Sequence, residues 1–299
     1  MTDPAAALDA LRDGLRSLGQ VLVAFSGGAD SAFLAWVAHD TLGAERAMAV
    51  TAVSPSLAAE ERADCAALAT EWGLRWSTVA TAELDDPAYA RNGEDRCAHC
   101  KTALMDALEP LAAEHGATIV LGVNLDDLGD HRPGQAVAAA RGAVFPLVEA
   151  GFTKAAVRDA SRRLGLRTWD KPAAACLASR LPYGTLVTVG VLSAVEAAEA
   201  GLHALGFRAV RVRHYGELAR LEVPVEELAV VVARREAVVA AVRAAGYRYV
   251  TLDLEGLRSG NLNGARPASG PGRGGIDAGP GRERDVVGAE VRHDPSLRP

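Results

Sequence analysis

The pattern of hydrophobic and polar positions differs between two parts of the chain. Between residues 21 and 147, short apolar runs rich in β-forming residues alternate with longer stretches of helical length. The predicted strands are 21–25, 47–54, 74–81 and 117–124, and helices are predicted at 57–72, at 101–116 and after the Gly-rich turn at Ser26. Strands that alternate with helices in this way indicate βαβ units and a parallel sheet. Such sheets bind ligands at the carboxyl ends of their strands.

The pattern of predicted strands and helices changes at about residue 187. The pattern then predicts a helix at 191–206, a hairpin of strands at 208–216 and 217–224, a helix at 227–246 and a strand at 247–254. We therefore predict an α/β fold with two units: a doubly wound parallel-sheet domain at 1–184 and a smaller α/β domain at 185–263. Residues 264–299 are rich in Gly, Pro and Arg, and we predict a disordered tail there.

Net charge and hydropathy argue against two classes of protein, those that grip nucleic acid and those that span a membrane. Lys and Arg number 32 against 38 Asp and Glu, a net charge of −6, and no long basic stripe is present. Because proteins that grip nucleic acid normally carry a basic surface, nucleic acid is not expected as the main partner. No uncharged apolar run reaches the roughly 18 residues that indicate a membrane span, and the N-terminal stretch lacks the features of a secretion signal. We expect a cytoplasmic protein.

The stretch "AFSGGADSAF" follows a predicted strand and opens a predicted helix. Gly27 and Gly28 allow the backbone to fold around an anion, and the helix N-terminus favours negative charge. Ser26 and Ser31 supply hydroxyl groups, and Asp30 can hold the Mg²⁺ that accompanies a polyphosphate. We call Ser26–Ser31 the phosphate loop and predict that it binds ATP; it is not a Walker A motif.

A second acidic cluster, "GVNLDDLGDHRPGQ", follows the predicted strand 117–124. Gly122 and Asp127 are assigned to the ATP site, because the carboxyl end of this strand lies beside the phosphate loop. Asp126 and Asp130 are further candidates for positioning metal and substrate, and Arg132 is a candidate for contacting an anion.

Four cysteines are present: Cys65, Cys97, Cys100 and Cys176. Structural disulfides are rare in a reducing compartment, so the C-x-x-C pair of Cys97 and Cys100 indicates zinc, redox or iron–sulfur chemistry. Cys65 has helical spacing with Leu68 and Trp72 and is predicted to lie in the core.

Cys176 lies in the small-residue run "WDKPAAACLASRLPYG". Lys171 and Arg180 flank it, and nearby cations increase the thiolate fraction of a thiol. We predict that Cys176 is a catalytic residue together with Asp30.

Several motifs occur in a characteristic order: "SGGADS", "NGEDRCAHCK", "NLDDLGDHRPG", "DKPAAACLASRLPYG", "RVRHYGELARLEV" and "LRSGNLN". Together they resemble the LarE family of ATP-dependent sulfur transferases, within the PP-loop ATP pyrophosphatase superfamily. The resemblance spans about residues 15–263. Two positions depart from the family pattern: Phe145 replaces a usual serine, and Ala98 stands where an aromatic residue is frequent.

The resemblance implies a specific reaction. ATP and Mg²⁺ would adenylate a carboxylate of a pyridinium mononucleotide, and a sulfur nucleophile would then displace AMP to leave a thiocarboxylate. The family acts in synthesis of the nickel-pincer nucleotide cofactor, between a carboxylating and a nickel-inserting enzyme, and forms homo-oligomers, typically hexamers. The 185–263 domain would bind substrate and take part in oligomerisation.

The implied substrate-binding residues are Arg180, Glu199, Arg211, Arg213 and Glu222. Arg211 and Arg213 are two apart on a predicted strand, so their side chains share a face. Two guanidinium groups on one face can clamp a phosphate.

The family has two sulfur sources. In one branch the cysteine matching Cys176 is consumed and becomes dehydroalanine; in the other, three cysteines hold a [4Fe–4S] cluster with one open iron. The presence of Cys97 and Cys100 favours the cluster, with Cys176 as the third ligand. A zinc site would need a fourth ligand, for which only His99 and Cys65 lie near in sequence.

Three rival functions stay open at this point. A tRNA thiolase shares the loop and the three-cysteine cluster. An ammonia-using ligase of the NAD synthetase type needs no cysteine trio. An ATP-sensing module would bind ATP without releasing pyrophosphate.

Overall fold

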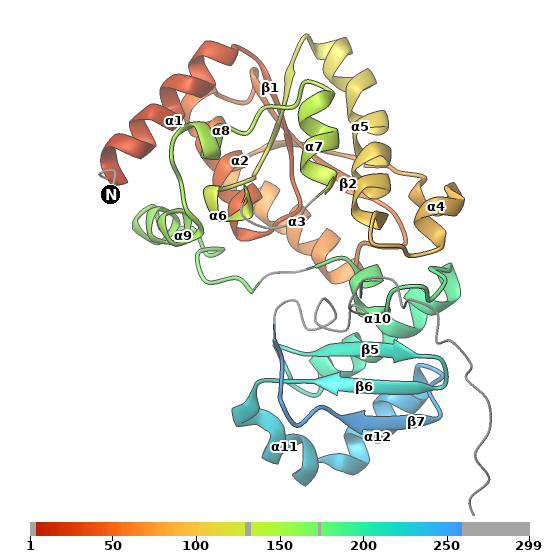
Figure 1. Ribbon diagram of the computed structural model, residues 1–299. Helices are drawn as coiled ribbons and strands as arrows, with labels where there is room; N and C mark the ends of the chain where they lie inside the picture. Colours follow the sequence, from red (N-terminus) through yellow and green to blue (C-terminus); the bar gives the residue numbers. More distant parts are fainter. Residues whose placement is uncertain (1–3, 129–132, 173–174, 259–299) are drawn as a thin grey trace, which may run out of the picture.

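The computed structural model describes residues 4–128, 133–172 and 175–258. Figure 1 shows a larger N-terminal unit built around a sheet, with a smaller unit below it that carries its own sheet. The tail predicted at 264–299 lies outside the described residues. Within the part of the chain that the structure describes, no helix is long and apolar enough to cross a membrane.

The larger sheet contains four parallel strands in the order β3-β2-β1-β4. Their bounds are Val21–Ala24 for β1, Ala47–Val53 for β2, Arg75–Ala80 for β3 and Thr118–Leu121 for β4. Strand β1 is central and apolar at every position, as expected for a strand that is covered on both faces. The predicted α/β fold with a parallel sheet is confirmed.

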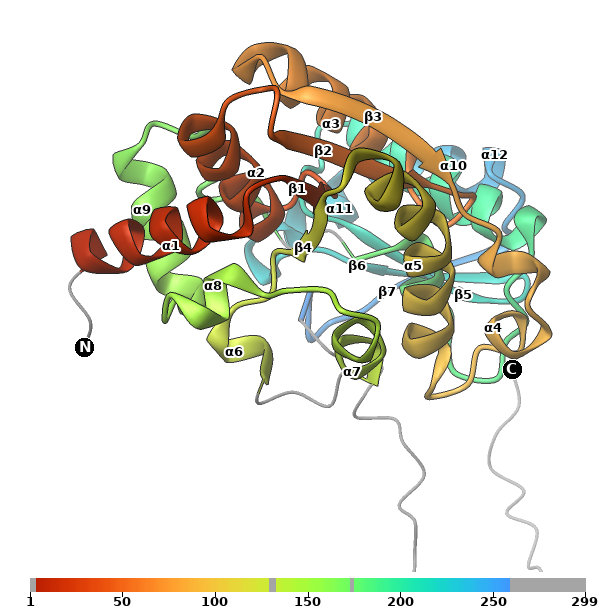
Figure 2. The same cartoon turned by 90° about the horizontal axis from the view of Figure 1, so that it is seen from above.

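Helices cover both faces of this sheet. They are α1 (Pro4–Leu18), α2 (Ala29–Leu42), α3 (Ala59–Trp72), α5 (Arg96–His115), α7 (Pro133–Ala140) and α9 (Lys154–Arg163), with three short helices α4 (Pro87–Ala90), α6 (Leu125–Leu128) and α8 (Pro146–Glu149). Val21 and Val23 pack into one core cluster with α1, α2 and α9, whereas Leu22 packs into a second cluster with α5. Figure 2 shows these two groups of helices on opposite sides of the sheet.

Helix α5 begins earlier than the sequence predicts. We expected a helix at 101–116, but it starts at Arg96. The C-x-x-C pair therefore lies within the helix, in its first turns, and not in a loop before it. Residues three apart on a helix share a face, so Cys97 and Cys100 occupy one side of α5.

The smaller unit contains α10 (Val189–Ala204), β5 (Arg211–Tyr215), β6 (Leu218–Glu222), α11 (Leu228–Ala233), α12 (Arg235–Ala244) and β7 (Tyr249–Leu252). Strands β5 and β6 form the predicted antiparallel hairpin, and β7 joins β6 in parallel. The single helix predicted at 227–246 is wrong. Two helices form there instead, and they meet at Arg234. The guanidinium of Arg234 donates a 2.6 Å hydrogen bond to the carbonyl of Leu205 at the end of α10.

A shared apolar cluster joins the two units. It combines Tyr89 of α4, Leu177 and Leu181 around the 3₁₀ helix η2 (Leu177–Arg180), and Leu192 and Val195 of α10. Helix α10 also contributes Ala198 and Leu202 to the core of the smaller unit. The domain boundary that we place at 184/185 remains a prediction, and it falls within this jointly packed region.

Candidate functional site

The phosphate loop joins the end of β1 to the start of α2. Gly27 has a left-handed backbone with φ of 69°, and a Cβ there would lie 2.9 Å from the Sγ of Cys65. The hydroxyl of Ser31 accepts a hydrogen bond from the amide of Ser26 (3.2 Å) and donates one to the carbonyl of Gly28 (3.2 Å). The loop is thus closed on itself at a helix N-terminus, an arrangement that favours anion binding.

Asp30 lies in the first turn of α2 and faces the end of β4. Burial raises the pKa of this carboxyl and the charge of Asp127 adds to the rise, while a hydrogen bond from Asn124 and the cations Lys154 and Arg158 oppose it. The amide of Asn124 donates this bond to Oδ1 of Asp30 at 3.1 Å. A buried carboxylate with a second one beside it suits a divalent cation, which removes their repulsion.

The end of β4 lies against the phosphate loop. A Cβ on Gly122 would lie 2.8 Å from the backbone N and Cα of Ser31, so only glycine permits this approach. Asp127 is buried beside it, and its Oδ2 accepts a hydrogen bond from the backbone amide of Asn124 (3.3 Å). Asn124 was not among our predicted residues. Its place between a strand end and an acidic pair was the available signal.

Asp126, the next residue of this acidic motif, bonds to helix α9. Oδ2 of Asp126 accepts a 2.6 Å hydrogen bond from the backbone amide of Lys154 at the start of α9. Asp130 and Arg132, which we considered as metal and anion contacts, lie outside the described residues. Phe145 packs against the core cluster that contains α5, and not along the cavity described next.

One cavity of about 770 Å³ connects the phosphate loop to the C-x-x-C helix. Its lining includes Ser26, Ser31, Gly122 and Asp127 from the phosphate loop and the end of β4. It also includes Arg96, Cys97 and Lys101 of α5, and Tyr183. Its volume is that of a typical small-molecule site. The sequence motifs that suggested ATP binding and sulfur chemistry therefore meet in one space.

The cysteines near this cavity are free thiols. Cys97 and Cys176 are exposed, whereas Cys100 is partly buried. Burial raises the pKa of Cys100 to about 12, with contributions from the charges of Cys176 and Glu83. The guanidinium of Arg96 lies close enough to Cys97 and Cys176 for their charges to raise its own pKa. The three thiols therefore share one electrostatic neighbourhood.

The two candidate zinc ligands near the pair in sequence, His99 and Cys65, lie in other surroundings. Among the described residues, no three His, Cys, Asp or Glu side chains are grouped to hold one metal ion. His99 Nδ1 pairs instead with Asp86 at 2.7 Å, and Cys65 is buried in the core as predicted. The ligands of a four-iron cube bind separate irons and so stand further apart than the ligands of one ion. A cluster held by Cys97, Cys100 and Cys176 stays a prediction.

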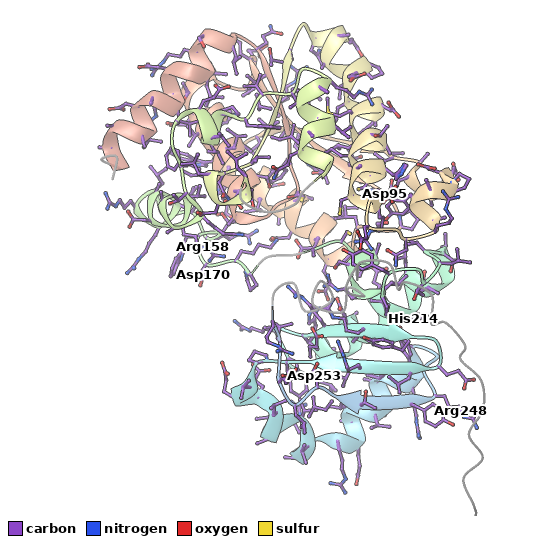
Figure 3. All side chains as sticks on the ribbon, in the orientation of Figure 1. Asp95, Arg158, Asp170, His214, Arg248 and Asp253 are labelled. Carbon is purple, nitrogen blue, oxygen red and sulfur yellow. The ribbon has the colours of Figure 1, made fainter. Side chains whose placement is uncertain are left out.

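Lys171 does not act on Cys176 as we expected. Its Nζ pairs with Glu61 (2.7 Å) and Asp64 (2.6 Å) on α3, so its charge is already balanced there. Arg158 on α9 holds the same segment by donating to the carbonyl of Lys171 (2.9 Å), and Figure 3 shows it beside Asp170.

Arg180 binds the backbone around Cys176. Its Nη1 donates to the carbonyl of Ala175 at 2.6 Å and approaches that of Cys176 at 3.4 Å. Its Nε and Nη2 form a two-point pair with the carboxylate of Glu199 on α10, at 2.9 and 3.0 Å, and both side chains are buried. Arg180 therefore connects the Cys176 segment to the smaller unit.

Arg211 and Arg213 both lie on β5, but their surroundings differ. Arg213 is buried and its Nη2 pairs with the fully buried Glu222 at 2.8 Å. One arginine of the predicted phosphate clamp therefore already has a carboxylate partner within the protein. Burial and the like charges of Arg180 and Arg213 lower the pKa of Arg211. An anionic ligand beside Arg211 would offset that repulsion.

Comparison with known proteins places these features in a family. The NAD synthase family model matches residues 6–104, which contain the phosphate loop. The chain is 38% identical to the pyridinium-3,5-bisthiocarboxylic acid mononucleotide synthase of Lactiplantibacillus plantarum over 250 residues, covering 83% of this chain and 91% of that protein. The chain belongs to the LarE family. An uncharacterized protein of Synechocystis sp. is 46% identical over 259 residues, covering 86% of this chain and 96% of that protein.

Membership of the LarE family accounts for the extent of the similarity. The NAD synthase match ends at residue 104, within α5, whereas the two relatives match most of the chain. The PP-loop fold of the larger unit is therefore shared with the NAD synthase family. The smaller unit and the segment around Cys176 belong to the part that the NAD synthase model leaves unmatched.

Proposed function

We propose that this LarE protein is an ATP-dependent sulfur transferase that converts the carboxylates of a pyridinium-3,5-biscarboxylic acid mononucleotide into thiocarboxylates, for synthesis of the nickel-pincer nucleotide cofactor. The observation that carries the proposal is the single cavity lined by both the phosphate loop and Cys97. It would let an acyl group activated at one side receive sulfur at the other.

The phosphate loop would bind the leaving end of ATP. Its amides, together with the hydroxyls of Ser26 and Ser31, would hold pyrophosphate, while Asp30 and Asp127 hold Mg²⁺. A substrate carboxylate oxygen would attack the α-phosphorus as the bond to pyrophosphate breaks. Fixed donors and metal around the departing charge lower the barrier of such a step.

The smaller unit would bind the phosphate of the mononucleotide. Arg211 would gain most from an anionic phosphate, because burial and the like charges of Arg180 and Arg213 lower its pKa. Arg213 and Arg180 each pair with a buried carboxylate. Glu222 and Glu199 would then hold Arg213 and Arg180 in place. These two arginines would in turn maintain the shape of the site. This refines the clamp of two arginines suggested by the sequence.

Cys97, Cys100 and Cys176 would hold a [4Fe–4S] cluster, whose open iron supplies sulfide chemistry when the cluster is bound. Sulfide attacks the acyl carbon and AMP leaves as the C–O bond breaks. The alternative source is Cys176 itself, which would lose its sulfur and become dehydroalanine. A cytoplasmic homo-oligomer, acting between a carboxylating and a nickel-inserting enzyme, completes the proposal.

The reaction can be tested directly with the full-length chain. With ATP, Mg²⁺, sulfide and the biscarboxylic mononucleotide, we expect AMP and pyrophosphate to form and the substrate to gain sulfur in place of oxygen. Pyrophosphate release without the mononucleotide, or ATP binding with no release when it is present, would contradict the proposal.

Three further outcomes separate the rivals. Ammonia-dependent amide formation that survives Cys97→Ala and Cys176→Ala would indicate a ligase of the NAD synthetase type. Retained RNA and salt-sensitive tRNA binding would indicate a tRNA thiolase. A subunit lighter by the elements of H₂S after turnover would indicate that Cys176 is consumed.

A further inference from the structure

Arg96 occupies the first position of α5, directly before Cys97, and points inward. Its side chain is buried, with 8% of the residue surface exposed. Nη1 donates to Oδ1 of Asn92 at 2.5 Å and to the carbonyl of Ala178 at 2.7 Å. Ala178 lies two residues after Cys176. One guanidinium therefore connects the helix that carries the cysteine pair to the segment that carries the third cysteine.

Asn92 forms hydrogen bonds with both Arg96 and the same segment. It is fully buried, and its φ of 56° makes it the one left-handed residue other than glycine within residues 4–128, 133–172 and 175–258. Its Nδ2 donates to the carbonyl of Pro182 at 2.8 Å, and its own carbonyl accepts from the amide of Gly184 at 3.0 Å. Buried donors and acceptors resist separation, because losing one partner leaves the other unsatisfied.

We propose that Arg96, held by Asn92, is a positioning residue that sets the separation between Cys97 and Cys176. The planar guanidinium bonds two acceptors at a fixed angle, so it holds α5 and η2 in one register. A lysine at this position would keep the charge but not the two-acceptor geometry. The functional consequence rests on the proposed function, since three cysteines can share one cluster only at a suitable spacing.

The separation itself can be measured in the metal-free protein. Nitroxide labels on Cys97 and Cys176, in full-length chain carrying Cys100→Ser, report the distance by their dipolar coupling; buried Cys65 stays in place. We expect a narrow distance distribution in this background. Arg96→Lys should broaden it while the protein remains folded, and Arg91→Lys, an exposed neighbour in the same segment, should leave it unchanged.

Asn92→Gly is the second variant, because glycine accepts the left-handed backbone while removing both side-chain hydrogen bonds. If Arg96→Lys does not fold, the distance distribution of Asn92→Gly tests the proposal. Broadening in Asn92→Gly supports the proposal, and an unchanged distribution in every folded variant overturns it. A residue with a merely structural role would lower the melting temperature without altering the distance below it.

A second readout separates this proposal from the proposed function. In protein with native cysteines, Arg96→Lys should reduce kcat for sulfur transfer by about tenfold to a hundredfold, as displacement of reacting groups does, and leave the KM for ATP unchanged. If wild type transfers no sulfur, the proposed function fails while the label distances still test the spacing. Normal sulfur transfer with normal distances in both variants would exclude a positioning role.

Discussion

At the scale of single residues, Gly122 offers the clearest test of the phosphate loop. The Cβ of Gly122→Ala would meet the backbone of Ser31 at 2.8 Å. Backbone atoms cannot rotate away, so we expect a loss of about 1–3 kcal/mol in the free energy of unfolding and weaker ATP binding. Gly14→Ala in α1, where a Cβ meets nothing within 4 Å, is the control and should stabilise by about 0.5–1 kcal/mol. Equal stability of the two variants would contradict the close approach.

The buried carboxyl of Asp30 leads to a prediction about pH and ligand. Its folded-state pKa lies above the ordinary value of 3.8 because burial disfavours the charge. The stability that it contributes is therefore present at acid pH and is lost as the pH rises through the raised pKa. At neutral pH, Asp30→Asn should raise the melting temperature of the ligand-free chain and remove the further rise caused by Mg²⁺ and ATP.

Exposed Asp9→Asn is the control for this change and should behave as wild type in both measurements. A lower melting temperature for Asp30→Asn would show that Asp30 bears no desolvation cost. An undiminished response to Mg²⁺ and ATP would show that it does not bind metal.

Residues of the phosphate loop could be predicted from the sequence because their neighbours in space are also neighbours in the chain. Arg96, Asn92 and Asn124 could not. Their partners lie 82, 90 and 94 residues away. Only Asn124, which stands between a strand end and an acidic pair, carries a local signal.

At the scale of elements, Arg234 is the residue that divides the predicted 227–246 helix. Its guanidinium bonds the carbonyl of Leu205 and lies 5.5 Å from the ring of Phe207. Arg234→Ala should therefore lower the free energy of unfolding by about 1 kcal/mol. Arg235→Ala, whose side chain is largely exposed, should change it by less than about 0.5 kcal/mol. Urea unfolding measures both, and similar values would mean that the contact to α10 is not stabilising.

Helix boundaries were predictable where the sequence carries a breaking residue and not elsewhere. Gly73 and Gly116 end α3 and α5 in left-handed conformations, close to where we placed the ends. The 227–246 stretch contains no internal Gly or Pro, so nothing local indicates its break. The early start of α5 was missed because its first turn is polar and carries the cysteine pair.

At the scale of the whole molecule, the buried pair of Arg180 and Glu199 connects the two units. Glu199→Gln leaves the Arg180 charge without its partner, and a broken buried pair costs about 3–5 kcal/mol in stability. Glu217→Gln breaks the exposed pair with Arg248 (Figure 3) and should cost about 0–1 kcal/mol. Equal effects in urea unfolding would argue that the connection between the units does not depend on this pair.

The two-unit organisation was predictable because the pattern of predicted strands and helices changes at about residue 187. The meeting of the phosphate loop with the cysteines was predictable only through the family resemblance. Nothing in the spacing of Ser26, Cys97 and Cys176 indicates that they share one neighbourhood, because that depends on how α5 and η2 pack together.

The most direct test of the central claim is anaerobic iron and sulfide analysis, with an absorbance spectrum, on wild type and Cys176→Ala. The proposed cluster held by Cys97, Cys100 and Cys176 predicts about four irons and four sulfides per chain in wild type, with a brown colour that Cys176→Ala loses. Colourless, iron-free wild-type protein that transfers sulfur at full rate, with Cys176 intact after turnover, would contradict the account.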